Sequence, residues 1–507
     1  MRRIKKILAS KLFITGILII AQIVVMFVGI YLLSQWLLPV YIILTIMDIL
    51  VVLYVVNANI SPAYKINWLI ISAIFPLASG VLYLMFGSRR VPPKFRREHL
   101  ASVLKFKPLL KNDEVLSEVS KGDESIYKQI KYINDYSYFP LYKYNKSTYY
   151  PTGESMFEAL LEDMKEAKHY IYIEMFILQQ GKLLNAILEV LEEKVKEGVD
   201  VRLIYDDIGS AMYLSRDFNR LLKEKGIKYQ MFNPMRPILL VTMNNRDHRK
   251  LVVIDGNVGY TGGLNFGDEY INEVSLYGLW KDAGIRIEGT AVKNMTVMFL
   301  QFWQASTEQI ITLPEGEPVV EFTEEKGYVQ PFSDSPTDSE DVSKTAHLNM
   351  IWSAKHHLYI MTPYFVVDNE TLSALKQASK NGIDVRIILP HVPDKVYMLE
   401  SARSYYKELI SAGVKVYEYT PGFIHSKVMM ADDRIAIVGT INMDYRSYYL
   451  NFECATLLYK TKALKDIRKD FDRTFEESQL IDMADCLKIP LYKVIIRAVL
   501  KLFAPIM

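Results

Sequence analysis

The feature that most constrains this sequence is a pattern that occurs twice. Residues 248–255 read His-Arg-Lys-Leu-Val-Val-Ile-Asp and residues 425–432 read His-Ser-Lys-Val-Met-Met-Ala-Asp, so both fit H-x-K-x4-D. A glycine turn and an asparagine follow each copy, at 262–265 and 439–442, and every position recurs at one offset of 177 residues. One such pattern arises easily by chance, but two in register indicate a single fold used twice.

The segments around each copy recur as well. Ala-Lys-His at 167–169 returns at 354–356, and Gly-Val-Asp-Val-Arg at 198–202 returns as Gly-Ile-Asp-Val-Arg at 382–386. Each half alternates strand and helix, which predicts an α/β fold with helices on both faces of a mainly parallel central sheet. We therefore predict two α/β/α domains related by a pseudo-two-fold axis, at residues 140–325 and 326–485.

The spacing within each copy has a structural meaning. Residues i and i+2 of a strand share a face, so the histidine and lysine of each copy would project together. The predicted site contains two imidazoles, two ammonium groups and two carboxylates at strand ends that brace the motif: His248, His425, Lys250, Lys427, Asp255 and Asp432. Such a set suits a phosphodiester, because lysines neutralise its oxygens while one imidazole attacks phosphorus and the other protonates the leaving oxygen. No metal or cofactor is needed for this chemistry.

The remaining histidines and the cysteines carry less information. His99, His347 and His391 stand in polar surroundings and are predicted at the surface, whereas the three histidines that precede strands are predicted to be structural. Only two cysteines occur, and neither lies in a CxxC pair, which argues against a disulfide framework and structural zinc. Sixty Lys and Arg balance 58 Asp and Glu, which argues against a broadly basic nucleic-acid binder.

The first ninety residues have the composition of a membrane region. Between Lys11 and Lys65 the only charged residue is Asp48, and apolar runs cover residues 12–33, 37–56 and 68–86. A run of about 20 apolar residues crosses a bilayer, so residues 1–90 are predicted to hold two to three transmembrane helices. Basic clusters lie at both ends of this region and both favour the cytoplasmic side. Three full spans cannot satisfy both, so either one run is re-entrant or interfacial, or one cluster binds anionic lipid.

Two further segments complete the predicted organisation. Residues 91–139 are interpreted as a basic juxtamembrane linker, and residues 486–507 as an amphipathic helix. Lys493, Arg497 and Lys501 form one cationic stripe on that helix, which would suit an anionic membrane surface. The alternative is an ordinary terminal core helix.

These residues resemble the phospholipase D superfamily, and within it the bacterial cardiolipin synthases. The resemblance extends from about residue 40 to the C-terminus, and the additional apolar run at 12–33 departs from the usual two-span pattern. It is carried by the duplicated motif and by Tyr83-Leu-Met-Phe-Gly87, Tyr260-Thr-Gly-Gly-Leu-Asn265, Trp280-Lys-Asp282, Val438-Gly-Thr-Ile-Asn-Met-Asp-Tyr-Arg-Ser447 and Leu450-Asn-Phe-Glu453.

The resemblance implies an enzyme of the bacterial cytoplasmic membrane that joins two phosphatidylglycerols into cardiolipin and releases glycerol, without a cofactor. It implies that His248 is the nucleophile and His425 the general acid, although pseudo-symmetry leaves these roles exchangeable. The lysines, together with Asn265 and Asn442, would hold the phosphoryl oxygens. Asp282 and Glu453 would each orient the imidazole of their own half. Anionic membrane lipid is the expected partner, nucleic acid is not, and the oligomeric state stays open.

Other functions remain compatible with the motif. A membrane-anchored phospholipase D that makes phosphatidic acid would keep every catalytic residue and differ only in its acceptor. Transfer to or from phosphatidylserine or phosphatidylethanolamine is also open. The apolar runs disfavour a nucleic-acid phosphodiesterase, and two intact motifs disfavour an inactive lipid-binding scaffold.

Overall fold

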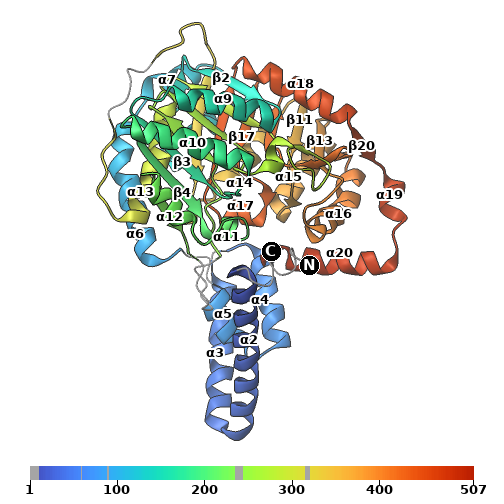
Figure 1. Cartoon of the computed structure of the whole chain (residues 1–507). Helices are drawn as coiled ribbons and strands as arrows, with labels where there is room; N and C mark the ends of the chain where they lie inside the picture. The colour runs from blue at the N-terminus through green and yellow to red at the C-terminus, as the bar shows by residue number, and fades with distance from the viewer. Residues whose placement is uncertain (1–10, 59, 88–90, 235–243, 315–319, 507) are drawn as a thin grey trace.

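The protein consists of an α/β body from which a helical hairpin projects (Figure 1). The computed structural model describes residues 11–58, 60–87, 91–234, 244–314 and 320–506. Both ends of the described chain lie where the hairpin meets the body.

The hairpin is formed by two apolar helices, α2 (Lys11–Trp36) and α3 (Leu38–Asn57). Both contain segments long and apolar enough to cross a membrane, Gly16–Trp36 and Leu38–Asn57. The third apolar run is divided near Pro76 into two short helices, α4 (Pro62–Ile74) and α5 (Ser79–Phe86), that pack against α3. Since α2 and α3 are antiparallel, the start of α2 and the start of α4 lie at the same end of the hairpin (Figure 1). Arg2, Arg3, Lys5, Lys6, Arg89 and Arg90 of the basic clusters lie outside the described residues.

The first domain is built on a seven-stranded sheet with the order β2-β9-β7-β6-β3-β4-β5. In that order the strands are Lys146–Tyr150, Gly284–Glu288, Val258–Gly262, Leu251–Ile254, Tyr170–Met175, Asp200–Asp206 and Lys228–Phe232. Its helices are α9 (Gly153–Lys165), α10 (Lys182–Lys196), α11 (Asp207–Ser210), α12 (Phe218–Glu224) and α13 (Val292–Thr307), with the 3-10 turn η3 (Asp268–Ile271).

The second domain repeats this arrangement in a nine-stranded sheet, β1-β10-β19-β17-β16-β11-β13-β14-β20. The strands are Tyr142–Lys143, Tyr328–Asp334, Glu453–Tyr459, Ile435–Gly439, Val428–Ala431, His357–Met361, Asp384–Pro390, Lys415–Tyr419 and Ser478–Ile481. Its helices are α14 (Val342–Ser353), α15 (Asn369–Lys380), α16 (Val396–Ser411), α17 (Tyr445–Tyr449), α18 (Ala463–Glu476) and α19 (Met483–Leu487).

The duplicated α/β class is confirmed, but the expectation of mainly parallel sheets was wrong. Within the two large sheets, among the described residues, only β3-β4-β5 and β11-β13-β14 pair in parallel, and these are the strand-helix-strand units read from the repeat. The motif strands β6 and β16 run antiparallel to β3 and β11 and turn tightly into β7 and β17. A tight turn reverses the chain, so strands joined by it cannot be parallel. The sheets are therefore mixed.

Residues 91–139, expected to form a linker, fold into four helical segments that join the core. They are α6 (Pro93–Phe106), η1 (Lys107–Leu110), α7 (Asp113–Val119) and α8 (Glu124–Tyr136). Phe106, Ile126 and Ile130 are completely buried. Helix α6 packs on α13 of the first domain and α8 packs on α14 of the second, so the segment fastens the two domains together.

The C-terminal helix α20 (Leu491–Phe503) lies along the edge of the body next to the hairpin (Figure 1). Its cationic stripe faces the protein: Arg497 Nε lies 2.7 Å from Glu400 Oε2 and Lys501 Nζ lies 3.5 Å from Glu408 Oε2, both on α16. The apolar side is exposed instead, with 57% of Ile495 accessible to solvent. The expectation that the stripe faces a membrane was therefore wrong, because acidic partners on α16 neutralise it.

Candidate active site

The two H-x-K segments meet where the domains join, each anchored to the other domain by its backbone. His248 N donates to Phe452 O at 3.0 Å, and Phe452 N donates to Arg246 O at 2.9 Å. In the other copy β8 (Leu279–Lys281) pairs in parallel with β15 (Gly422–Ile424), and His425 N donates to Lys281 O at 2.6 Å. Each histidine thus lies beside the residue that precedes a carboxylate of the opposite domain.

The carboxylates pair crosswise with the imidazoles. His248 Nδ1 lies 2.9 Å from Glu453 Oε2, and His425 Nδ1 lies 2.6 Å from Asp282 Oδ2. The expectation that each carboxylate orients the imidazole of its own half was therefore wrong. The physical reason is that the backbone of each H-x-K segment hydrogen-bonds to the other domain. This pairing places Glu453 next to His248 and Asp282 next to His425. Among the described residues, each motif histidine therefore has its carboxylate partner in the other domain and not in its own.

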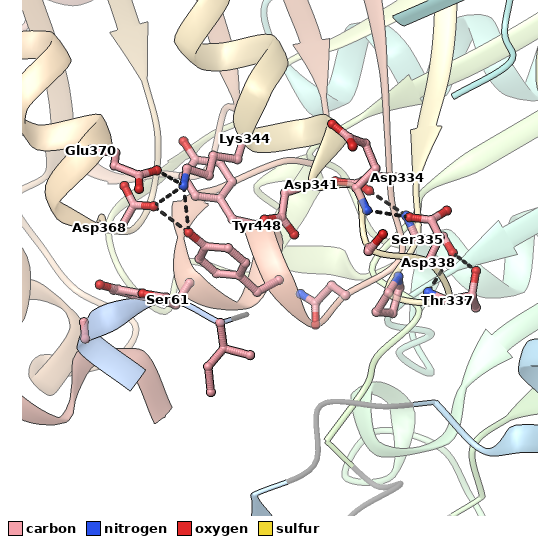
Figure 2. A pocket seen from close by; sticks show the side chains of 18 of the residues that line it. Ser61, Asp334, Ser335, Thr337, Asp338, Asp341, Lys344, Asp368, Glu370 and Tyr448 are labelled. Carbon is pink, nitrogen blue, oxygen red and sulfur yellow. Dashed lines mark hydrogen bonds and ion pairs between the residues drawn. The ribbon is translucent and has the colours of Figure 1, made fainter. Parts of the chain in front are cut away.

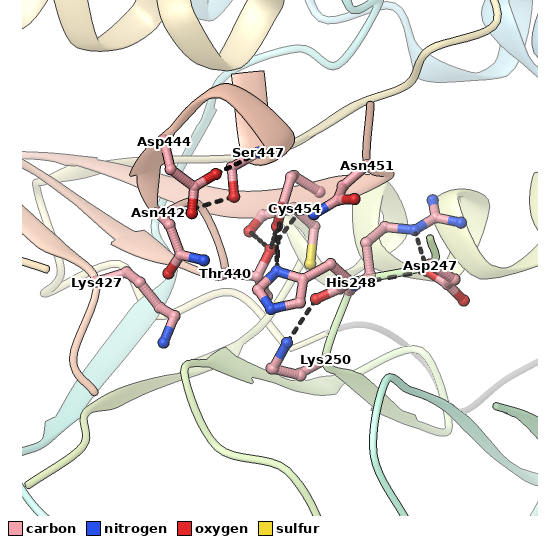
Figure 3. Close-up of polar contacts among 12 residues, drawn as sticks. Asp247, His248, Lys250, Lys427, Thr440, Asn442, Asp444, Ser447, Asn451 and Cys454 are labelled. Carbon is pink, nitrogen blue, oxygen red and sulfur yellow. Dashed lines mark hydrogen bonds and ion pairs between the residues drawn. The ribbon is translucent and has the colours of Figure 1, made fainter. Parts of the chain in front are cut away.

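Both lysines point into the same space as the imidazoles. Lys250 Nζ donates to His248 O at 2.7 Å, Lys427 Nζ donates to His425 O, and Figure 3 shows both amines approaching His248. Burial lowers the pKa of Lys250 to about 8 and that of Lys427 to about 7. A phosphate anion between the two amines would stabilise their protonated forms, so the arrangement suits an anionic substrate.

Burial also keeps the imidazoles neutral. It lowers the pKa of His248 to about 4, although the Glu453 carboxylate opposes the shift. Burial and the charges of Lys427 and Lys250 hold the pKa of His425 well below its usual value. A neutral imidazole whose Nδ1 faces a carboxylate leaves Nε2 as a free base, which is the form required of a nucleophile.

The two orienting carboxylates differ in their surroundings. Burial would raise the pKa of Glu453, but the nearby His248 and Lys250 outweigh it and the pKa is lowered. Burial raises the pKa of Asp282 to about 6 against the opposing charge of Lys427. Glu453 also accepts a hydrogen bond from Thr440 Oγ1, whereas the matching position in the first copy is Gly263. The carboxylate of the His248–Glu453 pair therefore keeps its charge to a lower pH than that of the His425–Asp282 pair.

Asp255 and Asp432 lie at the far ends of β6 and β16, away from the imidazoles. Asp255 accepts from the backbone N–H groups of residues 168, 169 and 170 at 2.7–2.8 Å. Asp432 accepts in the same way from residues 355, 356 and 357 at 2.7–3.0 Å. Both adopt positive φ angles, 50° and 53°, at the start of the turn. Each carboxylate thus fixes the end of the motif strand to the start of the neighbouring strand, β3 or β11.

The two asparagines of the motif are not equivalent. Asn265 Oδ1 accepts from Ile177 N at 3.0 Å and its Nδ2 donates to Tyr270 Oη at 2.6 Å. Asn442 Oδ1 is buried without a hydrogen-bond partner among the described residues, and Asn442 lines a cavity together with His248. Both amide atoms of Asn265 are thus engaged, whereas the Asn442 carboxamide lines the cavity, where its Nδ2 could donate to a phosphoryl oxygen and its Oδ1 could accept from a hydroxyl group.

This cavity, called here the His248 cavity, has a volume of about 120 Å³. Its lining combines aromatic and apolar side chains with Arg246, Lys395, Arg446, Asn451 and Asp444. A larger acidic cavity of about 930 Å³ lies beside it and shares Tyr445 and Asn451 with it (Figure 2). The carboxylates labelled there include Asp334, which accepts from Ser343 N, and Asp368, which pairs with Lys344. Neither motif histidine lines the larger cavity, whereas His248 lines the smaller one. The candidate reaction site is therefore the smaller cavity.

Several features were not foreseen from the sequence. Arg246, Lys395 and Arg446 line the cavity, and only Arg446 falls within a motif that the sequence analysis quoted. His99 and His347 were predicted at the surface but are buried, with Nδ1 atoms 3.1 Å from Thr337 Oγ1 and 3.0 Å from Tyr448 Oη. Helices α6 and α14 pack against other helices and bury these two histidines. The polar residues around them in the sequence do not indicate this packing.

Comparisons with known proteins place the chain in a family. A model described as "Cardiolipin synthase, PLD-like domain" matches residues 160–303 and 347–475, one segment in each domain. A cardiolipin synthase of Alkalihalophilus pseudofirmus is 35% identical over 89% of this chain and 90% of its own length. Cardiolipin synthase 2 of Bacillus anthracis is 36% identical over 89% and 88%, respectively. The crystal structure of a phosphatidylserine synthase from Haemophilus influenzae shares the fold, with a TM-score of 0.56, 15% identity and coverage of 75% of this chain and 98% of that chain.

Proposed function

Because this chain belongs to the cardiolipin synthase family with duplicated PLD-like domains, we propose that it joins two phosphatidylglycerol molecules into cardiolipin and releases glycerol. The observation that carries this proposal is the crosswise site: two imidazoles, each paired with a carboxylate of the other domain, around two buried lysines. No step requires a metal or cofactor. We place the reaction at the bacterial cytoplasmic membrane, with α2 and α3 as spans of a multi-pass protein.

In the first step His248 Nε2 attacks the phosphorus of the donor lipid. The phosphorus–oxygen bond to the headgroup glycerol breaks, and His425 gives a proton to the leaving oxygen. His425 carries this proton in the substrate complex, because the anionic donor phosphate offsets the charges of Lys427 and Lys250 that lower its pKa in the empty site. His248 is favoured as the nucleophile because it lines the cavity and because the pKa of its partner Glu453 is lowered, whereas that of Asp282 is raised. Lys250, Lys427 and Asn442 stabilise the charge on the phosphoryl oxygens.

In the second step the neutral His425 accepts the proton of a glycerol hydroxyl on the acceptor lipid. The hydroxyl oxygen attacks phosphorus, the bond to His248 breaks, and cardiolipin leaves. The proton gained by His425 is available for the next leaving glycerol, so the cycle closes. If water took the place of the acceptor, the product would be phosphatidic acid, which is the competing hydrolase function.

Transfer to lipid rather than water requires the site to open toward the bilayer. Ala504, directly after α20, lines the His248 cavity, and the η4 turn (Ala504–Ile506) contacts α4 of the membrane region. The exposed apolar side of α20, with Leu491, Ile495 and Val499, would rest in the membrane interface beside this opening. Ile495→Glu should then reduce activity on vesicles, whereas Leu480→Glu, at an exposed leucine on β20, should not. Equal activities of the two variants would refute this placement.

A lipid assay tests the reaction itself. Purified full-length protein in liposomes receives phosphatidylglycerol as the only phospholipid and no added metal, and mass spectrometry resolves the products. Cardiolipin plus glycerol, lost in both His248→Ala and His425→Ala, is the expected result. Phosphatidic acid alone would identify a hydrolase, and unchanged lipid would exclude phosphatidylglycerol as the donor.

A further inference from the structure

The proposed reaction brings two phosphodiesters to one site. The donor phosphate occupies the space between Lys250 and Lys427 and becomes attached to His248. The acceptor lipid carries its own phosphate, separated by the three carbons of glycerol from the hydroxyl that attacks. A second anion must therefore be accommodated a short distance from the reacting phosphorus, and burying it without positive charge would be costly.

Arg446 at the start of α17 provides a positive charge that no carboxylate neutralises directly. Among the described residues its guanidinium donates to Asn244, from Nη1 to Oδ1 at 3.0 Å and from Nη2 to the backbone oxygen at 2.7 Å. Among the described residues no Asp or Glu lies within ion-pair distance of it, although the side chain is largely buried in the cavity wall. By contrast, Arg246 in the same wall has Asp206 Oδ1 at 3.3 Å.

Lys395 provides a second cation at the mouth of the cavity. It precedes α16, its side chain is half exposed, and its nearest carboxylate oxygen, on Asp394, is 3.9 Å away. That carboxyl group already accepts a hydrogen bond from Tyr364 Oη. Lys395 is therefore free to turn toward an anion that enters from outside.

Asp444 is the single carboxylate among the residues that line the His248 cavity. One of its oxygens caps α17 by accepting from Ser447 N at 2.8 Å. Since Arg246 is paired with Asp206, the lining holds two further cations, Lys395 and Arg446, against the single carboxylate of Asp444. This excess of positive charge lies beside the nucleophile but outside the pair of catalytic lysines.

We propose that Arg446 and Lys395 form a second phosphate subsite, which binds the phosphodiester of the acceptor lipid and directs its glycerol hydroxyl to the phosphorus on His248. The inference rests on the proposed function and identifies what makes the enzyme a transferase. The buried Arg446 holds the anion in a fixed orientation through its planar guanidinium, whereas Lys395 guides the headgroup at the mouth. An acceptor without a phosphate would gain nothing from either residue.

The test compares two acceptors in the full-length enzyme. Cardiolipin formation from phosphatidylglycerol uses an acceptor with a phosphate, whereas exchange of labelled glycerol into phosphatidylglycerol uses one without. In the Arg446→Met variant the acceptor phosphate loses its hydrogen-bonded charge pair with the guanidinium. This variant should therefore form cardiolipin roughly tenfold more slowly, or slower still. Glycerol exchange should stay within about twofold, since it needs only the donor site. Lys395→Met should show the same selectivity more weakly, and Lys469→Met, which removes an exposed cation on α18, should change neither activity.

The outcomes separate the possible failures. Equal loss of both activities in Lys395→Met, whose half-exposed side chain is not part of the core, would show that the cations serve the donor or the chemistry and would overturn the subsite. Unchanged cardiolipin formation in both variants would overturn it as well. If the unmodified enzyme exchanged glycerol but made no cardiolipin, the proposed function itself would fail.

Discussion

Because the imidazoles and carboxylates pair crosswise, removing one carboxylate should impair the histidine of the other domain. Pairing within each domain would predict the opposite assignment. Glu453→Gln should impair His248, the proposed nucleophile, whereas Asp282→Asn should impair His425, the proposed acid. Both substitutions keep the shape of the side chain and remove its charge. The imidazole then loses the partner that holds its tautomer and stabilises its protonated form.

The expected size of the effect follows from the geometry. At 2.9 Å, and with an effective dielectric constant of about 20, two unit charges attract by about 6 kcal/mol, which is an upper limit. A glutamine still offers a dipole, and hydrogen bonds to charged groups are worth about 1.5–3 kcal/mol. We therefore expect Glu453→Gln to lower kcat roughly 10- to 150-fold. Asp282→Asn, at 2.6 Å, should fall in a similar range.

A substrate with a better leaving group distinguishes the two carboxylates. A phosphatidyl ester of p-nitrophenol leaves without protonation, so its cleavage still needs the nucleophile but no longer the acid. The first-turnover burst of nitrophenolate, followed by absorbance, reports the first step alone and should be largely restored in Asp282→Asn but stay slow in Glu453→Gln. Steady-state release is not the readout, because the second step still needs His425 as a base. Rescue of Glu453→Gln with no rescue of Asp282→Asn would refute either the crosswise pairing or the assignment of roles. His248→Ala and His425→Ala, assayed alongside, show which of the two failed.

Three further predictions rest on single features of the site. Because the pKa values of Lys250 and Lys427 are lowered to about 8 and about 7, both amines lose their protons as the pH rises through this range, and kcat/KM should fall. A pH-rate profile that stays flat to pH 9 would contradict this prediction. A Cβ on Gly263 would lie 2.0 Å from Asp282 Oδ1, so Gly263→Ala should displace this carboxylate and lower kcat roughly 100-fold. Circular dichroism should show a retained fold, and near-normal turnover would refute the close approach. Asp255→Ala removes the acceptor of three backbone N–H groups and should destabilise the protein by about 2–4 kcal/mol in thermal unfolding, while a loss of kcat at unchanged stability would assign the carboxylate to chemistry instead.

The repeat determined much about this protein in advance. Two copies of H-x-K-x4-D in register predicted a duplicated α/β fold and a site shared between the copies, because local periodicity and motif spacing are properties of sequence. The apolar runs predicted the membrane region for the same reason. The bracing role of Asp255 also followed from its position at a strand end. The direction of the motif strands did not follow, since a strand pattern is the same in parallel and antiparallel pairing.

Only the tertiary structure decided which carboxylate serves which imidazole. Glu453 lies 28 residues after His425, yet it contacts His248, because the main-chain bonds of His248 and Phe452 join the two domains. The orientation of α20 was decided in the same way: a cationic stripe reads alike whether it faces lipid headgroups or, as here, Glu400. Sequence fixes which groups a segment presents and at what period, but the partner of a charge depends on contacts between residues far apart in the chain.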